Sequence, residues 1–233
     1  MEIAPGIDII GPSLWLKKEK TLIINDLHLG YEEALHKKGV LVPKQQYGLV
    51  IKELKEILAK VQPQRIVING DLKHEFGTVS RQEWKDVLDL LDFLLQKCPE
   101  VILIQGNHDP IIKPLAEKKN LQVVSELNLG KILIAHGDEL VETSAKTIII
   151  GHEHTAITIR DGSKFEKFKC FLKGRWRKKE LIVVPSFNPL LEGTDIMQEK
   201  LLSPFLENIS SFNVYVISKG EVFEFGKVKD IKT

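Results

Sequence analysis

The sequence predicts an α/β domain in which two β-sheets pack together and helices lie on the outside. Seven short apolar segments rich in β-branched residues recur along the chain, as buried strands do. Two long segments between the first three carry apolar residues at helical spacing, which indicates β-α-β-α-β in the first half. The second half is strand-rich, and this favours a second sheet. Because no linker, repeat or low-complexity segment interrupts the chain, residues 1–233 are expected to form one domain.

Each element follows from a local pattern. The expected strands are 21–25, 65–69, 101–105, 131–136, 146–151, 181–185 and 214–218. The first helix is indicated by apolar residues that repeat every three or four positions from Tyr47 to Leu58. The second runs from about Trp84 to Leu95 and is preceded by Ser80 and Glu83, which have the spacing of a capping box. Further helical segments are expected at 110–119 and 195–208.

Composition restricts the class of protein. The net charge of +1 gives no indication of an anionic partner, and the hydrophobic content of 43% is enough for a sizeable core. Cys98 and Cys170 are too few for a disulfide framework and do not form a C-x-x-C pair. No segment reaches the ~18 unbroken apolar residues of a membrane span. A cytoplasmic protein without a membrane partner is therefore expected.

One segment is strongly basic despite the neutral total. Residues 164–179 hold eight basic residues and one acidic residue, with aromatic residues between them. Lysine and arginine contacts to phosphates dominate nucleic-acid affinity, and aromatic rings can stack on unpaired bases. The alternative is a solvated hairpin whose lysines only increase solubility. The candidate nucleic-acid contacts are Lys173, Arg175, Arg177, Lys178 and Lys179.

Polar side chains follow five of the expected strands, at the point where each strand ends. Six of the seven histidines lie in such positions. In open α/β sheets, ligands bind beyond the carboxyl ends of the strands, so these side chains are expected to converge. The candidate ligands are Asp26, His28, Asp71, Asn107, His136, His152 and His154.

The types and number of these side chains predict a metal centre. Imidazole, carboxylate and amide oxygen without thiolate suit first-row divalent ions. Seven ligands are too many for one tetrahedral ion and about right for two ions that share a bridging carboxylate, for which Asp71 is the best candidate. Two ions about 3.5–4 Å apart can clamp the attacking and leaving oxygens of a phosphoryl displacement, and they lower the pKa of a bound water towards ~7. Two manganese ions are expected first, with iron, zinc, cobalt, nickel or magnesium as alternatives.

Taken in order, the motifs resemble the calcineurin-like metallophosphoesterase superfamily. They are D-x-H at 26–28, G-D at 70–71, G-N-H-D at 106–109, the histidine at 136 and G-H-x-H at 151–154. The resemblance implies two packed mixed sheets flanked by helices, a four-layer α/β/β/α fold. It assigns one ion to Asp26, His28, Asp71 and His154, and the other to Asp71, Asn107, His136 and His152.

The resemblance also implies roles for three further residues. His108 matches the catalytic histidine that stabilises or protonates the leaving oxygen, and Asp109 would accept a hydrogen bond from its ring. Gly-Asp-Leu-Lys-His at 70–74 is similar to a motif of the nuclease subunit in DNA double-strand-break repair complexes, in which His74 would position the phosphate. A hydrogen-bonding role beside a ligand is the alternative for His74. FLKGRW at 171–176 and VVPSFNP at 183–189 resemble small archaeal phosphoesterases related to that nuclease.

These observations favour a hydrolase. The first hypothesis is a dimetal-dependent phosphodiesterase that uses in-line attack of a metal-bound hydroxide, with single-stranded nucleic acid as a candidate substrate. The second is a small-molecule phosphomonoesterase or cyclic nucleotide phosphodiesterase with the same site. The third is a binding scaffold without activity, which the presence of all seven ligands disfavours.

Overall fold

The computed structural model describes residues 1–75, 80–109, 112–119 and 121–231 as two mixed β-sheets with few helices. The first sheet has the strand order β1-β2-β3-β4-β5-β6-β7. Strands β4 to β7 are parallel, whereas β1 to β4 pair in antiparallel fashion. Their bounds are Glu2–Ala4, Ile7–Ile10, Ser13–Leu16, Thr21–Asn25, Arg65–Asn69, Glu100–Ile104 and Gln122–Val124.

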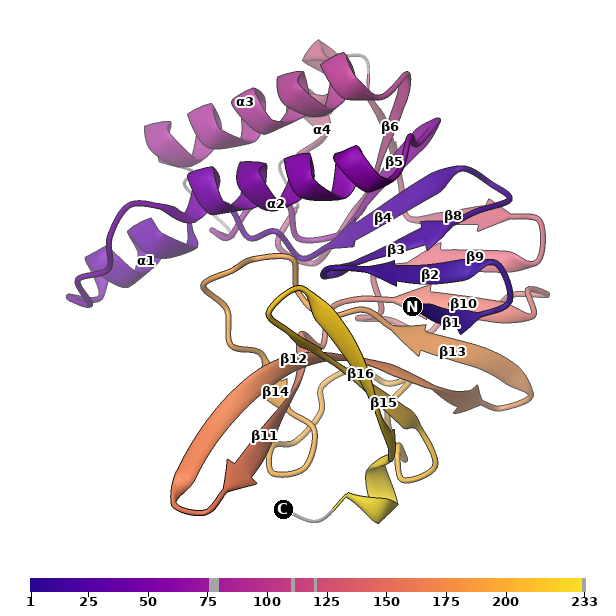
Figure 1. Ribbon diagram of the computed structural model, residues 1–233. Helices are drawn as coiled ribbons and strands as arrows, with labels where there is room; N and C mark the ends of the chain where they lie inside the picture. The colour runs from indigo at the N-terminus through magenta and orange to yellow at the C-terminus, as the bar shows by residue number, and fades with distance from the viewer. Residues whose placement is uncertain (76–79, 110–111, 120, 232–233) are drawn as a thin grey trace.

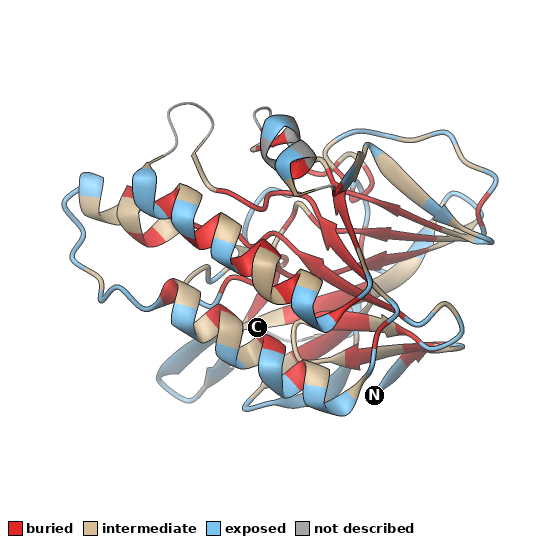
Figure 2. Cartoon of the chain, turned by 90° about the horizontal axis from the view of Figure 1, so that it is seen from above, coloured by how far each residue is buried: buried red, intermediate tan, exposed pale blue. Residues whose placement is uncertain are grey.

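Helices lie over one face of this sheet (Figure 1). The two long helices are α2 (Gln46–Lys60) and α3 (Arg81–Lys97). Two shorter helices are α1 (Tyr31–Lys37) and α4 (Lys113–Lys118). The buried stripes of α2 and α3 face the sheet, and their outer faces are exposed (Figure 2).

The second sheet packs against the other face of the first. Parallel strands β9, β10 and β13 form its centre, and antiparallel strands flank them. A long hairpin of β11 and β12 and a hairpin of β15 and β16 extend the sheet. The bounds of β8 to β16 are Glu126–Leu129, Ile132–Ala135, Thr147–Ile150, Thr155–Asp161, Lys164–Trp176, Lys179–Val183, Thr194–Asp195, Asn213–Ser218 and Glu221–Lys227, followed by a short 3-10 helix at Val228–Asp230.

Alternation along the strands divides the core into layers. In β4, Ile23 points between the two sheets, whereas Leu22 and Ile24 point toward the helices. In β10, Ile149 faces the first sheet, and its neighbours face the outer side of the second sheet. Because successive strand residues point to opposite faces, apolar residues on both faces make these strands continuous apolar runs.

All seven expected strands are present, with bounds that differ by two residues or less. The two long helices are confirmed, and the Ser80 hydroxyl accepts a hydrogen bond from the Glu83 N–H at 3.0 Å. Strands β1 to β3 were not predicted, because β1 has only three residues, Asp8 interrupts β2, and β3 contains no β-branched residue. The basic segment contains the whole of β12, a strand of 13 residues. Of the helix expected at 110–119, α4 is present, and residues 110 and 111 lie outside the described residues.

The prediction of a helix at 195–208 is wrong. This stretch consists of β14, turns and irregular chain. The Asp195 carboxylate accepts a hydrogen bond from the Met197 N–H, and this local turn competes with helical bonding. Pro204 disfavours helical backbone at the preceding residue. The outer face of the second sheet is therefore covered by side chains such as Phe205 and Leu206, and not by the helical layer expected there.

A buried glutamate holds this irregular segment to the second sheet. The Glu153 carboxylate accepts hydrogen bonds from the N–H groups of Leu202 and Ser203 at 2.6 and 2.8 Å. An unsatisfied buried donor costs about 1–3 kcal/mol, so Glu153→Ala is expected to lower the free energy of unfolding by about 2–3 kcal/mol in urea titrations. The exposed Glu207→Ala is the matched control and is expected to change it by less than about 0.5 kcal/mol. Equal stability of the two variants would contradict this role.

None of the helices in the described part of the chain is both long and apolar enough to cross a lipid bilayer.

Candidate metal centre

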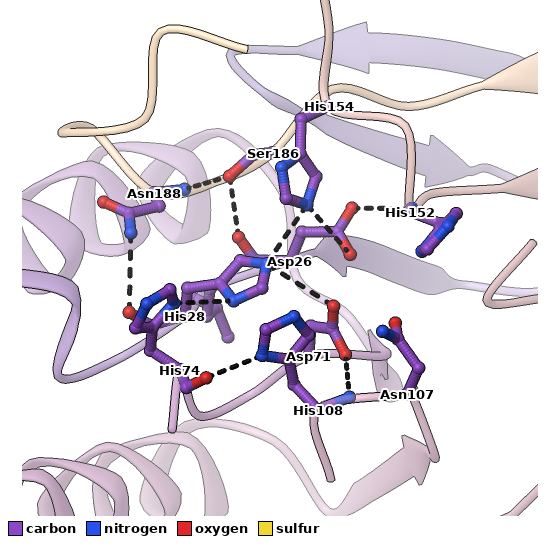
Figure 3. A network of polar contacts seen from close by, with 12 residues as sticks. Asp26, His28, Asp71, His74, Asn107, His108, His152, His154, Ser186 and Asn188 are labelled. Carbon is purple, nitrogen blue, oxygen red and sulfur yellow. Dashed lines mark hydrogen bonds and ion pairs between the residues drawn. The ribbon is translucent and has the colours of Figure 1, made fainter. Parts of the chain in front are cut away.

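The seven expected ligands lie together at the carboxyl ends of the parallel strands of both sheets. Figure 3 labels all of them except His136. Asp26 follows β4, Asp71 follows β5 and Asn107 follows β6. From the second sheet, His136 follows β9, and the 151–154 loop follows β10. Strands that run in the same direction end at the same edge, and the packing of two such sheets therefore brings the two sets of ends together.

The first group of ligands matches the first expected ion site. Asp26, His28, Asp71 and His154 offer ligand atoms that all lie within 4.8 Å of one another. His28 Nε2 is 3.1 Å from His154 Nε2 and 3.4 Å from Asp71 Oδ2. His154 Nε2 is 3.7 Å from Asp26 Oδ1. The four side chains thus surround one point.

The second group shares Asp71 with the first. Asp71, His136 and His152 form a further set of atoms within 4.8 Å. His136 Nε2 lies 3.5 Å from Asp71 Oδ2, 3.2 Å from His152 Nδ1 and 3.0 Å from Asn107 Oδ1. One oxygen of Asp71 is therefore in contact distance of both groups, which is the position that a bridging carboxylate requires.

The backbone at these ligands is strained. Among the described residues, eight non-glycine residues have positive φ, and five of them are expected ligands. Such conformations are uncommon for residues with a side chain, and they concentrate at functional sites where the surrounding structure enforces them. The five are Asp26, His28, Asp71, His152 and His154, with φ of 50°, 43°, 45°, 65° and 50°.

The polar atoms of the cluster are arranged in a way that suits coordination of divalent ions better than hydrogen bonding to one another. Imidazole nitrogens of His28 and His154 face each other at 3.1 Å, and those of His136 and His152 do so at 3.2 Å. In addition, Asp26 Oδ1 and His136 Nδ1 are buried without a hydrogen-bond partner among the described residues. Buried polar atoms are normally paired, and nitrogen lone pairs that converge with carboxylates are the donor set of first-row divalent ions.

The charges of the ligands suit this interpretation. Burial lowers the pKa of His28 well below its usual value and also lowers that of His152, so both rings are neutral as metal ligands must be. Burial acts on His136 in the same direction, but its contact with Asp71 and the charge of Asp26 raise its pKa to about 9, so a metal ion bound here would displace a proton from this ring. The contact with His136 lowers the pKa of Asp71, against the effect of burial. Asp71 is thus ionised, as a bridging ligand must be.

Gly106 has no side chain and therefore leaves space for the adjacent carboxylate of Asp71. A Cβ atom on Gly106 would lie 2.2 Å from Asp71 Oδ1 and 2.4 Å from the Asp71 backbone nitrogen. Gly106→Ala is expected to displace Asp71 and to weaken metal binding by about 10–100-fold, the range seen when supporting residues of metal sites are lost. Isothermal titration with Mn²⁺ measures this. The matched control is Gly48→Ala in α2, where a Cβ meets no atom within 4 Å. Equal metal affinity of both variants would contradict the argument.

His108 lies beside the first group of ligands. The centroid of its ring is 4.8 Å from that of the His28 ring, and its backbone N–H donates to Asp71 Oδ1 at 2.9 Å. His108 Nδ1 lies 2.6 Å from the carbonyl oxygen of His74. A carbonyl only accepts, so Nδ1 carries a hydrogen, and the proton that the ring gains or loses in catalysis is on Nε2.

The expected partner of the His108 ring is corrected. The His74 carbonyl occupies the role predicted for Asp109, whose oxygens accept hydrogen bonds from the N–H groups of Gly106, Leu72 and Lys73 at 3.2, 3.3 and 3.4 Å. Burial raises the pKa of Asp109 to about 6. Asp109 therefore connects the G-N-H-D turn to the loop after β5.

His74 lies behind the ligands. Its Nδ1 is 3.5 Å from His28 Nδ1, and its ring stacks on that of His108 at 5.6 Å. His28, His74 and His108 are also close enough to form a third possible metal-binding group, which shares His28 with the first. The contact with His28 favours the alternative role for His74, a hydrogen-bonding residue beside a ligand.

Sequence analysis missed several residues that support the centre. Lys73 is completely buried, and its ammonium donates to the carbonyl oxygens of His108, at 2.5 Å, and Glu75. The Ser186 hydroxyl donates to the carbonyl of Asp26 at 2.7 Å, and the partly buried Lys169 donates to the carbonyls of Ser186 and Asn188. Ser186 and Asn188 lie in the VVPSFNP segment, so the family resemblance was the only signal for them.

Four of the five expected nucleic-acid contacts in the basic segment lie at the end of the second sheet opposite to the metal ligands. Arg175 pairs with Glu180 of β13, and Glu180 pairs with Thr147, the first residue of β10. The metal ligands follow the last residue of β10, three residues or about 10 Å further along the strand. Two of the lysines are engaged with main-chain carbonyls: Lys173 with Ile3 and Lys179 with Ala145. Arg175, Arg177, Lys178 and Lys179 therefore lie at the end of the sheet opposite to the centre. Lys173 pairs with Ile182, level with Ile149 and one residue short of the ligand end, but its ammonium is held by the carbonyl of Ile3.

Comparisons with known proteins agree with this geometry. A search of curated proteins finds no match. Among solved structures, the nuclease MPE of Pseudomonas putida has a TM-score of 0.68 at 18% identity over 94% of both chains, which shows a shared fold. The phosphoesterase YfcE of E. coli has a TM-score of 0.44 at 16% identity, over 89% of this chain and 97% of its own. Residues 19–217 match the family Calcineurin-like phosphoesterase. The chain therefore belongs to the calcineurin-like phosphoesterase family.

Proposed function

We propose that this protein is a dimetal-dependent phosphodiesterase that hydrolyses single-stranded nucleic acid. The observation that carries the proposal is the position of Asp71 Oδ2, 3.4 Å from His28 and 3.5 Å from His136, between two complete groups of ligands. A scaffold has no need for such an arrangement or for its strained backbone. The shared fold with a nuclease from Pseudomonas putida supports a nucleic-acid substrate.

In this proposal each ion has its own ligands and shares one. Two divalent ions, with manganese as the first candidate, would supply positive charge to the phosphate and lower the pKa of a bound water. The ion sets are Asp26, His28, Asp71 and His154 for one ion, and Asp71, Asn107, His136 and His152 for the other.

His108 acts on the leaving group. The His74 carbonyl and the backbone contact to Asp71 hold its ring in one orientation. In its protonated form, His108 donates a proton from Nε2 to the leaving oxygen, and such general acid catalysis contributes about 10²–10⁴-fold. Lys73 and Asp109 keep the two loops that carry these groups in register.

The test is a substrate panel on metal-reconstituted protein. The substrates are bis-p-nitrophenyl phosphate, p-nitrophenyl phosphate and a fluorescent single-stranded oligonucleotide, each with Mn²⁺, Zn²⁺, Fe²⁺, Co²⁺, Ni²⁺ or Mg²⁺. We expect cleavage of the diester and the oligonucleotide, loss of both with EDTA, and slower cleavage of the monoester. A monoester rate far above the diester rate would replace this proposal with a small-molecule phosphatase. No cleavage of any of the three substrates would refute a phosphoesterase.

A further inference from the structure

Glu83 is a buried acidic residue whose carboxylate contacts the loop that follows β5. It lies in the first turn of α3 and is only 1% exposed. Its Oε1 atom accepts hydrogen bonds from the N–H groups of His74 and Glu75, both at 3.0 Å. Acidic side chains are almost never fully buried without partners. The contacts of Glu83 therefore show where this side chain acts, which is on the main chain of residues 74 and 75.

The side chain of Glu83 has little freedom to leave this position. A Cβ atom on Gly30 would lie 2.8 Å from both Cγ and Cδ of Glu83, so the side chain packs directly against the Gly30 main chain. The His74 N–H also donates to the Leu29 carbonyl at 2.9 Å. In the described part of the chain, the Glu75 N–H has Glu83 as its only acceptor. Glu83 therefore determines the direction of the Glu75 N–H.

This N–H belongs to the same peptide bond as the carbonyl of His74. A trans peptide is planar, and its N–H and C=O point in opposite directions, so the orientation of one determines that of the other. The His74 carbonyl accepts the hydrogen bond from His108 Nδ1 at 2.6 Å, which Figure 3 draws as a dashed line. One rigid group thus connects Glu83 to the His108 ring. Hydrogen bonds in such a chain polarise and strengthen one another.

The main chain of His108 is held separately from its ring. The Lys73 ammonium donates to the His108 carbonyl at 2.5 Å and also to the Glu75 carbonyl. The backbone N–H of His108 donates to Asp71 Oδ1 at 2.9 Å. These contacts do not pass through Glu83. Loss of the Glu83 carboxylate is therefore expected to release the ring of His108 without displacing its main chain.

We infer that Glu83 is a positioning residue for His108. It fixes the peptide between His74 and Glu75, and the carbonyl of this peptide keeps the hydrogen of the ring on Nδ1. The hydrogen bond at one ring nitrogen sets the tautomer, so Nε2 remains available for proton transfer. Glu83 thus supplies, through one peptide, the carboxylate support that the sequence assigned to Asp109. This inference rests on the proposed function for the task of Nε2, whereas the tautomer can be tested without a substrate.

The experiment compares three variants at position 83 with a control at the same end of α3. Glu83→Ala removes the acceptor, Glu83→Asp withdraws it by one methylene group, and Glu83→Gln retains an acceptor oxygen at the same distance. The matched control is Ser80→Ala, which removes the hydrogen bond to the Glu83 N–H but not the contacts with the loop. Each substitution is made in the wild type and in His108→Ala. Circular dichroism and mass spectrometry measure folding and Mn²⁺ content.

The first measurement is independent of activity. Long-range ¹H–¹⁵N spectra of Zn²⁺-loaded protein with labelled histidine show which ring nitrogen carries the hydrogen, at alkaline pH where a histidine ring is neutral. The spectrum of His108→Ala identifies the His108 signals by their absence. We expect the hydrogen on Nδ1 in the wild type, Glu83→Gln and Ser80→Ala. Glu83→Ala and Glu83→Asp should contain both tautomers.

The second measurement is kcat on a single-stranded oligonucleotide and on bis-p-nitrophenyl phosphate. Glu83→Ala and Glu83→Asp should lower kcat on the oligonucleotide by about 10-fold, the lower end of the range for residues that support groups of a metal site. The small diester should be cleaved at nearly the wild-type rate, because p-nitrophenolate leaves without a proton. In His108→Ala the same substitutions should have no further effect, since both residues act through one ring. Glu83→Gln and Ser80→Ala should retain the wild-type kcat.

Three results would overturn the inference. The first is a folded Glu83→Ala protein in which the His108 hydrogen stays on Nδ1. The second is an equal loss of kcat with and without the His108 ring, which would give Glu83 a general structural role. The third is loss of bound ions, which would assign Glu83 to support of the ligands. If Glu83→Ala does not fold, Glu83→Asp is judged by the same criteria.

Failure of the proposed function would be recognised separately. If the wild type cleaves neither the small diester nor the oligonucleotide, the phosphodiesterase proposal fails. The tautomer of His108 in Glu83→Ala and Glu83→Asp then still decides whether Glu83 positions the ring.

Discussion

Replacing Asp71 with asparagine is expected to deplete both metal ions and to lower diester hydrolysis by more than about 100-fold. Loss of a residue that only supports a metal ligand lowers metal affinity or activity by about 10–100-fold. Asp71 is expected to be a ligand shared by two ions, so its loss should have a larger effect. One of its oxygens lies 3.4 Å from His28 and 3.5 Å from His136, closer to both ligand groups than the nearest oxygen of Asp26, which is 3.7 Å from His154 and 3.6 Å from His136. A neutral amide has a similar shape but does not supply the charge of a bridging ligand.

The measurement is metal content by mass spectrometry after loading with Mn²⁺ and dialysis, followed by turnover of bis-p-nitrophenyl phosphate. The matched control is Asp89→Asn on the exposed face of α3, which should bind two ions per chain and retain full activity. Circular dichroism shows whether the Asp71 variant is folded. A folded Asp71→Asn protein with two ions per chain would contradict the bridging role.

Replacing His108 with alanine is expected to leave the metal content unchanged and to lower oligonucleotide turnover by about 10²–10⁴-fold. His108 is outside the two ligand groups, and its main-chain N–H, which alanine retains, makes the contact with Asp71. The loss should therefore appear in kcat and not in the number of bound ions.

The choice of leaving group makes this prediction specific. The oxygen that leaves from a nucleic-acid diester needs a proton, whereas p-nitrophenolate leaves without one. The His108→Ala variant should therefore lose much less activity on bis-p-nitrophenyl phosphate than on the oligonucleotide. Equal losses on the two substrates would assign His108 to positioning and not to proton transfer, and unchanged kcat on both would exclude a catalytic role.

Much of the fold was predictable because its signals are local. The strands that carry the ligands are continuous apolar runs such as TLIIN and RIVIN, and α3 has both an apolar stripe and the capping residue Ser80. The helix expected at 195–208 failed because its apolar residues cover a sheet face without forming a helix. The hairpins of the first 16 residues were missed because Asp8 interrupts the apolar run of β2 and because β3 contains no β-branched residue.

In the candidate site, too, some features were predictable from the sequence and others were not. The sequence by itself determined which side chains are available, since Asp26, His28 and the others occupy strand ends whatever the sheet order. Only the tertiary structure decided that one oxygen of Asp71 faces both ligand groups, that the His108 ring bonds to the His74 carbonyl, and that Arg175 lies at the remote end of the second sheet. These features depend on strand order and register between residues far apart in the chain, whereas residue type and spacing act over a few positions.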